Sequence, residues 1–258
     1  SLELLEAAQL ELEIISSSIR SRHRAQWNRK LGRSTRVIPA ASRSSWSRAN
    51  ELIAKLKRRR GRLFDTPGSG DAAVATARRT ELVAIDRIIR RAWALDGWAR
   101  LLEGRAHGDA ASLRRAMKSF ARVLEVPVLQ LNPEAASRDL RRDATVARST
   151  VGLALALAAT GRDEEALEWM ELSASPEVRS SVRLDAARWH VLLAAEAGRF
   201  DVVRDVLERA GDDDPDLGVL AAIESCHHQD NAARSVVNQV VNSLAEQSDT
   251  GRLRLIGR

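Results

Sequence analysis

The stretch that decides the fold is "STVGLALALAATGRDEEALEWMELSASPE", residues 149–177, which reads as two helices joined by a Gly-Arg turn. Its first half is an apolar run typical of a buried helix, and its second half alternates charged and apolar residues at helical spacing. A second stretch, "ARWHVLLAAEAGRFDVVRDVLERAGDDDP" at 187–215, repeats the same order of parts. The two align at Gly161 and Gly198, 37 residues apart, and this period predicts stacked helical hairpins.

The residue pattern of these hairpins resembles the tetratricopeptide repeat. The first hairpin has large, small and turn residues where that family places them, at Leu153, Ala154, Leu157, Gly161, Ala166 and Met170. The second has valine for two small residues, at Val191 and Val203, and keeps the pattern at Gly198, Leu207, Ala210 and Pro215. Further units can be drawn through Trp98, Leu101, Ala116, Phe120 and Pro127, and from Leu217 and Gly218. The resemblance covers residues 90–245 and implies a solenoid whose concave face binds peptides or neighbouring proteins.

Composition also favours an all-α fold. Helix-forming Ala, Leu, Arg and Glu dominate, while Tyr is absent and Phe occurs three times. Helix starts are expected at Thr80 and Asp109, which can act as caps, and at three cap residues followed by proline, namely Asn132, Ser175 and Asp214. The resulting fold class is a basic N-terminal helical segment followed by a tetratricopeptide-like array of antiparallel helical hairpins.

The expected domains follow from one linker-like stretch, "DTPGSGDAA" at residues 65–73. It separates a basic helical or extended anchor segment, 1–64, from a helical-repeat domain, 74–248. A polar tail, 249–258, completes the chain. A flexible loop inside one domain is the competing interpretation of the 65–73 stretch.

Charge is distributed very unevenly along the chain. Residues 16–62 carry fifteen Lys and Arg against one acid, Glu51, whereas residues 149–258 have a net charge of −8. The first of these segments should attract polyanions and the second should repel them. Arg outnumbers Lys by 37 to 4. This ratio suits bidentate phosphate or carboxylate contacts, and a GC-rich genome would also produce it.

The basic segment is the strongest functional signal. Its Arg and Lys residues would surround a helix on several faces, and counterion release makes such clusters bind nucleic acid with strong salt dependence. Trp27 and Trp46 are candidates for stacking on unpaired bases. The predicted nucleic-acid-binding residues are Arg20, Arg22, Arg24, Trp27, Arg29, Lys30, Arg33, Arg36, Lys55, Lys57, Arg58, Arg59, Arg60 and Arg62. An acidic protein partner and a merely solvated surface remain the alternatives.

No catalytic residue is predicted, because the chain has no phosphate-binding glycine loop or nucleophile elbow. The best metal candidate, "CHHQD" at 226–230, places adjacent side chains around a helix and has no second ligand cluster, so no metal and no cofactor are expected. Glu164, Glu168 and Glu171 share one helical face and suggest a solvated or partner-facing acidic stripe. His190, beside Trp189 in an apolar helix, is expected in the core or between hairpins.

The sequence therefore predicts a non-enzymatic scaffold or assembly subunit. Its array would dock a protein partner in a larger assembly, and residues 16–62 would contact RNA or DNA. A pure protein–protein adaptor, whose basic segment meets an acidic partner, is the alternative. The longest apolar run, Val151 to Ala159, is too short for a bilayer span, so no membrane insertion is expected. One cysteine, Cys226, fits the cytoplasm or another reducing compartment such as the nucleus or an organelle matrix.

Overall fold

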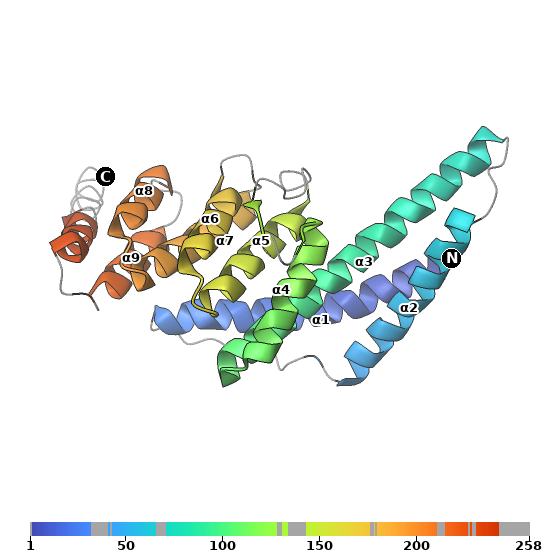
Figure 1. Ribbon diagram of the computed structural model, residues 1–258, viewed down its shortest axis with the longest axis horizontal. Helices are drawn as coiled ribbons and strands as arrows, with labels where there is room; N and C mark the ends of the chain where they lie inside the picture. Colours follow the sequence, from blue (N-terminus) through green and yellow to red (C-terminus); the bar gives the residue numbers. More distant parts are fainter. Residues whose placement is uncertain are drawn as a thin grey trace, which may run out of the picture. The chain divides into compact units, whose positions relative to one another are not determined.

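The computed structural model describes residues 2–31, 41, 43–65, 71–127, 131–133, 143–175, 178, 180–210, 215–226, 228 and 231–242. No strand occurs among these residues, and the expected all-α class is confirmed. The chain divides into two compact units, Ser1–Ser137 (unit 1) and Arg138–Arg258 (unit 2), whose helices are labelled in Figure 1. None of the described helices has an apolar stretch long enough to cross a bilayer.

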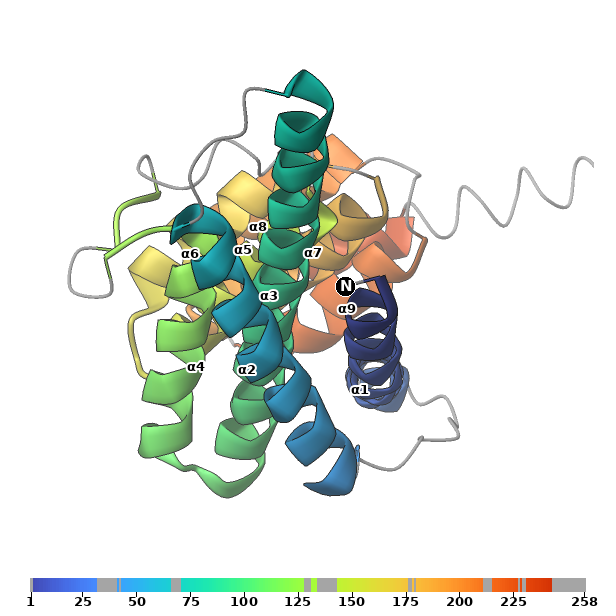
Figure 2. The same ribbon diagram turned by 90° about the vertical axis from the view of Figure 1, so that its right-hand side faces the viewer.

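Unit 1 is built from α1 (Leu2–Lys30), α2 (Arg43–Asp65), α3 (Ala72–His107) and α4 (Ala110–Leu124). The three long helices α1, α2 and α3 pack on one another, and α4 packs along the second half of α3 (Figures 1 and 2). Trp98 of α3 connects three of the helices, because its ring lies 5.0 Å from the ring of His23 on α1 and 5.6 Å from that of Phe120 on α4. The apolar first half of α1 continues without a break into the basic stretch.

The position of α2 follows from its apolar residues. Ala49, Ile53, Leu56 and Leu63 recur at helical spacing and are all buried. Each large aliphatic side chain buried in this way stabilises the fold by about 1.5–3 kcal/mol. The charged residues of α2 consequently lie on its flanks and its outer face.

The predicted start of α3 at Thr80 is wrong. The helix begins at Ala72, and its N-cap is Asp71, whose carboxylate accepts a hydrogen bond of 2.8 Å from the N–H of Ala73. Thr80 lies two turns inside, where its hydroxyl donates to the carbonyl of Thr76 at 3.0 Å. Because a threonine can satisfy its hydroxyl within a helix, it does not have to begin one.

The stretch 65–73 connects α2 with α3 inside unit 1, and its residues 66–70 lie outside the described residues. The division by packing at Ser137 thus differs from the division by composition at 65–73. The physical reason is that α1 and α2 bury their apolar faces against α3 and so belong to the same core. The expected tail 249–258 lies outside the described residues.

Unit 2 contains α5 (Ala144–Ala158), α6 (Asp163–Ala174), α7 (Ser180–Glu196), α8 (Phe200–Ala210) and α9 (Pro215–Ser225), followed by a helical stretch at 231–242. Neighbouring helices pack in pairs, and α7 packs on α5 and α9 as well as on α6 and α8. α9 begins at the proline that the sequence placed at a first helical position. Asn132 and Pro133 are described, but the helix expected to follow them falls on residues outside the described ranges.

The two Gly-Arg turns have the same backbone structure. Gly161 and Gly198 have φ of 77° and 71°, a region that glycine enters without steric cost. The N–H of Arg162 donates to the carbonyl of Leu157 at 3.1 Å, and the N–H of Arg199 donates to that of Ala194 at 2.7 Å. The period of 37 residues is therefore present in the backbone hydrogen bonds as well as in the sequence.

Candidate nucleic-acid interface

The candidate interface is the outer face of α2. Four exposed basic residues recur there at spacings of seven, three and four, which return them to one side of a helix; we name Arg48, Lys55, Arg58 and Arg62 the α2 stripe. From its first to its last residue the stripe extends about 21 Å, at 1.5 Å per residue. This length corresponds to about six phosphates of one strand at 3.4 Å each.

Lys55 and Arg48 of the α2 stripe form ion pairs with acidic residues. Lys55 Nζ lies 2.7 Å from the carboxylate of Glu51, one turn away, and this hydrogen bond lowers the pKa of Glu51. Arg48 reaches Glu11 of α1 at 3.4 Å. Because exposed ion pairs are weak and screened by salt, a phosphate can replace the carboxylate of Glu51. The side chain of Glu11 is only 13% exposed, so Arg48 is more firmly paired. Arg58 is exposed and has no ion pair with any other described residue.

Arg59 and Arg60, both predicted to bind nucleic acid, are turned toward α3. Arg59 forms two hydrogen bonds with Glu81, of 2.9 and 3.1 Å, and Arg60 is hydrogen-bonded to Asp86. Both arginines are half-buried, and their hydrogen bonds connect α2 with α3. Lys57 lies with its Nζ 5.5 Å from the centre of the Trp93 ring, which is a cation–π contact between the same two helices.

On α1, Arg20 is paired with an acid of its own helix, Glu13. Glu13 binds two guanidinium groups, that of Arg20 at 2.6 Å and that of Arg91 from α3. These hydrogen bonds, first from Arg20 and then from Arg91, lower the pKa of Glu13. Within the described part of the chain, Arg24 and Arg29 of α1 are also exposed, and they have no ion pair with another described residue.

The remaining candidate residues are either half-buried or lie outside the described residues. Arg22 is half-buried on α1. The side chains of Trp27 and Lys30, and the whole of Arg33 and Arg36, lie outside the described residues. Trp46, the second expected stacking residue, is half-buried on α2. The role of all these residues in binding nucleic acid stays a prediction.

Sequence reasoning missed one aromatic residue, Phe64 in the last turn of α2. It is 57% exposed, and the guanidinium carbon of Arg60 lies 4.9 Å from the centre of its ring. The available signal was the Arg60–Phe64 spacing of four residues, which brings a cation and a ring together on a helix. The exposure of the ring depends on how α2 packs on α3, and no local pattern contains that information.

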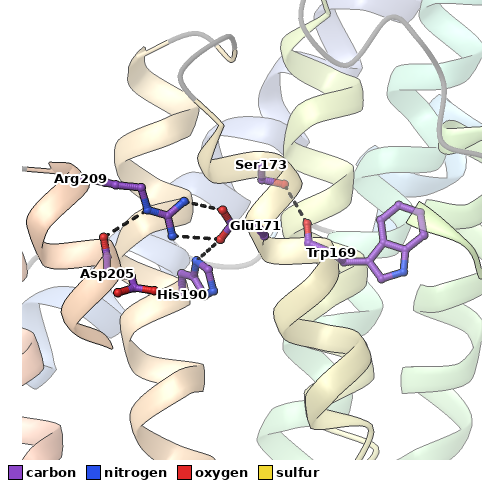
Figure 3. Close-up of polar contacts among 6 residues, drawn as sticks. All are labelled: Trp169, Glu171, Ser173, His190, Asp205 and Arg209. Atoms are coloured by element: carbon purple, nitrogen blue, oxygen red, sulfur yellow. Dashed lines mark hydrogen bonds and ion pairs between the residues drawn. The ribbon is translucent and has the colours of Figure 1, made fainter. Parts of the chain in front are cut away.

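Unit 2 holds a polar cluster between α6, α7 and α8 (Figure 3). Arg209 is hydrogen-bonded to both carboxylate oxygens of Glu171, which lowers the pKa of this acid, and Nδ1 of His190 lies 3.7 Å from the same carboxylate. His190 is 1% exposed, which confirms its expected position in the core. Desolvation lowers its pKa to about 4, so the imidazole is neutral at pH 7.

The expected acidic stripe of α6 is exposed, and two of its members are ion-paired. Glu164 binds Arg199 at 2.9 Å, and Glu171 binds Arg209 as described above. Arg199 belongs to the second Gly-Arg turn and Arg209 lies on α8, which follows that turn, so these ion pairs connect one helix pair to the next. In the "CHHQD" stretch Cys226 is exposed, while His227 and Asp230 lie outside the described residues.

The chain matches no protein-family model, and comparison with curated proteins and with solved structures gives no match either. Its function therefore has to be inferred from its own residues. By charge the two units are opposite: unit 1 has 26 Lys and Arg against 14 Asp and Glu, a net charge of +12, and unit 2 has 15 against 21, a net charge of −6.

Proposed function

We propose that the protein is a non-enzymatic assembly subunit that contacts nucleic acid through the basic helices of unit 1 and docks a protein through the helical array of unit 2. The observation that carries the first half is the α2 stripe, a row of exposed cations about 21 Å long on a helix that the core fixes in place. The net charge of +12 on unit 1 supports it, because the field of the whole unit raises the local concentration of a polyanion.

Binding is tested with fluorescently labelled RNA and DNA 20-mers, single-stranded and as duplexes, by fluorescence anisotropy at several salt concentrations. The variant Lys55→Gln/Arg58→Gln/Arg62→Gln removes three cations of the α2 stripe. Its affinity for a single strand should fall, and the slope of log Kd against log salt should decrease by about 2, at about 0.7 counterions for each phosphate contact.

The matched control is Arg114→Gln/Arg115→Gln/Lys118→Gln, which removes the same charge from exposed positions of α4 in the same unit. It should change the salt slope by much less than the α2 variant. Equal effects of the two variants would show that general charge, and not the α2 stripe, attracts the ligand. Absence of binding by the unaltered protein at low salt would refute the nucleic-acid function.

A second candidate is an adaptor whose basic segment binds an acidic protein. It is favoured by a specific observation: arginines of α1, α2 and α3 already hold carboxylates within unit 1, at Glu13, Glu81 and Asp86. Competition between poly-glutamate and an oligonucleotide of equal charge separates the two candidates. An adaptor should prefer poly-glutamate, and a nucleic-acid-binding subunit should prefer the oligonucleotide.

The second half of the proposal, that unit 2 is a tetratricopeptide-like array that docks a protein, is supported by three observations. The Gly161 and Gly198 turns repeat after 37 residues, α7 packs on both α5 and α9, and ion pairs connect successive helix pairs. Purification at low salt with and without nuclease tests the docking. A protein that binds directly should remain after nuclease treatment, and one bridged by nucleic acid should be lost.

A further inference from the structure

Phe64 is exposed, and its ring and its backbone carbonyl each contact an arginine side chain. On one side of its ring lies the guanidinium of Arg60, and Arg60 is itself fixed by a hydrogen bond to Asp86 of α3. The backbone carbonyl of Phe64 accepts a hydrogen bond of 3.1 Å from Nη2 of Arg78. More than half of the side-chain surface remains open to solvent, at 57% exposure. An apolar ring is thus at the surface, in contact with a cation, instead of being buried.

The helix surface next to this ring is bare. Gly61 lies three residues before Phe64, one turn away, in the interior of α2. A Cβ added at Gly61 would have no atom within 4 Å, so packing does not require glycine at this position. Glycine in a helix interior is destabilising relative to alanine, and the chain nevertheless places it beside the exposed ring.

Four cations and one acid, the exposed Asp65, lie around the ring and the bare surface. Arg60 lies against the ring, Lys57 lies one turn before Gly61 on the same side, and Arg58 and Arg62 of the α2 stripe follow the adjacent side of the helix. An exposed aromatic ring, an open area beside it and cations along the same helix are the parts with which proteins stack bases while they bind the strand backbone.

We propose that Phe64 and the bare surface at Gly61 form a stacking platform for an unpaired base, so that the ligand of unit 1 is single-stranded nucleic acid. This inference rests on the proposed nucleic-acid function. In a duplex the flat faces of the bases are covered by their neighbours, and only an unpaired base can offer its face to the ring.

The experiment uses the full chain and the labelled 20-mers described above, single-stranded RNA, single-stranded DNA and the matching duplexes. Phe64→Ala should weaken binding of the single strands by about 5-fold to about 100-fold, the range that one stacked base contributes. Phe64→Leu, which keeps an apolar side chain but no ring, should lose nearly as much, whereas Phe64→Trp should retain the affinity. Binding of the duplexes should change less than twofold.

Two further variants check that the effect belongs to the platform. Gly61→Leu covers the bare surface with a strong helix former; the melting temperature should stay equal or rise while single-strand binding weakens. Val83→Ala shortens another exposed apolar side chain, 53% exposed on α3, and should leave all affinities unchanged.

The outcomes separate this inference from the function on which it rests. If Phe64→Ala leaves single-strand binding unchanged while the triple α2 variant weakens it, the platform is refuted and the nucleic-acid function stands. Equal losses for single strands and duplexes would also refute the platform, because stacking on an unpaired base cannot affect a duplex. If the unaltered protein binds no oligonucleotide, both proposals fail.

Discussion

The helix pair α3–α4 of unit 1 and the helix pair α5–α6 of unit 2 have the same type of turn. They differ in the size and polarity of the residues between their helices. In both turns a glycine has positive φ, 66° at Gly108 and 77° at Gly161. The following residue in each case donates its N–H to a carbonyl five residues earlier, at 3.0 and 3.1 Å. The fourth residue before and the fifth residue after that glycine are Gly104 and Leu113 in α3–α4, which are in contact. In α5–α6 the equivalent positions are Leu157 and Ala166, both fully buried.

A second layer, seven residues farther from the turn on each helix, also differs between the two helix pairs. In α3–α4 the pair is Gly97 and Phe120, and a Cβ on Gly97 would lie 2.7 Å from the phenylalanine ring. In α5–α6 the pair is Thr150 and Ser173, whose hydroxyl groups are hydrogen-bonded at 2.6 Å and buried. The backbone turn therefore sets which residues meet, and different combinations of size and polarity fill the same place.

Exchanging the large and small residues of the first layer should have the largest effect. Gly104→Leu brings a side chain into Leu113, whose Cγ is 2.8 Å from the position of the new Cβ, and should destabilise unit 1 by about 3 kcal/mol. Adding Leu113→Ala should recover much of this loss, because α5–α6 already places leucine opposite alanine. Urea denaturation of the single and double variants measures the coupling.

The reverse exchange in unit 2 is the matched control. Ala166→Leu should destabilise α5–α6 by a similar amount, and Leu157→Ala should partly restore it. Both residues are fully buried, so the helix pair cannot relax into solvent. Additive effects in both pairs would contradict the equivalence of the two turns.

The polar interior of unit 2 should make it more sensitive to acid than unit 1. The folded pKa of His190 is lowered to about 4, whereas its unfolded value is 6.5, so below pH 6.5 the unfolded state takes up a proton that the folded state excludes. Unit 2 should lose about 2 kcal/mol between pH 7 and pH 5. In unit 1 the lowered pKa of Glu13 gives stability that is present above about 4.5 and lost only below it.

Hydrogen exchange of backbone amides in α7 and α3 at pH 7 and pH 5 measures this difference. Protection in α7 should fall at pH 5, and protection in α3 should remain. His190→Gln removes the titrating group and should make the protection of α7, relative to the intrinsic exchange rate at each pH, nearly equal at pH 7 and pH 5. Equal losses of protection in the two helices would contradict the prediction.

Thr150→Val tests the buried pair of hydroxyl groups. Ser173 then keeps only its hydrogen bond of 3.4 Å to the carbonyl of Trp169 (Figure 3), and leaving a buried hydroxyl poorly satisfied should cost about 1–2 kcal/mol. The double variant Thr150→Val/Ser173→Ala removes both polar groups and should be closer to the unaltered protein than Thr150→Val alone. Thermal unfolding followed by circular dichroism gives both values.

Features with a local cause could be predicted from the sequence. The start of α4 after Asp109 and of α9 at Pro215 depends on a cap or a proline next to the helix itself. The turns at Gly161 and Gly198 could be predicted because glycine is the residue that most readily adopts the positive φ that they have. The extent of unit 1 could not be predicted, because it depends on the burial of α1 and α2 against α3.

Of the candidate site, only the excess of positive charge could be predicted from the sequence. The excess of cations in residues 16–62 is visible in the sequence, but Arg91 meets Glu13 across 78 positions and Arg59 meets Glu81 across 22. Such long-range ion pairs decide which arginines are available to a ligand. The exposed ring of Phe64 is a tertiary feature for the same reason.

The smallest predicted effects test the shared turn itself. Gly108→Ala, Gly161→Ala and Gly198→Ala each force a residue with a Cβ into positive φ, and each should cost about 1 kcal/mol. A Cβ would have no neighbour within 4 Å at any of the three positions, so the cost is purely conformational and should be nearly equal. Equal values from urea denaturation would identify one backbone turn in all three helix pairs, regardless of what fills their interiors. A markedly smaller cost at Gly108 would instead show that the turn of α3–α4 differs from the turns of unit 2. The positions of Gly104 and Leu113 could then not be equated with those of Leu157 and Ala166.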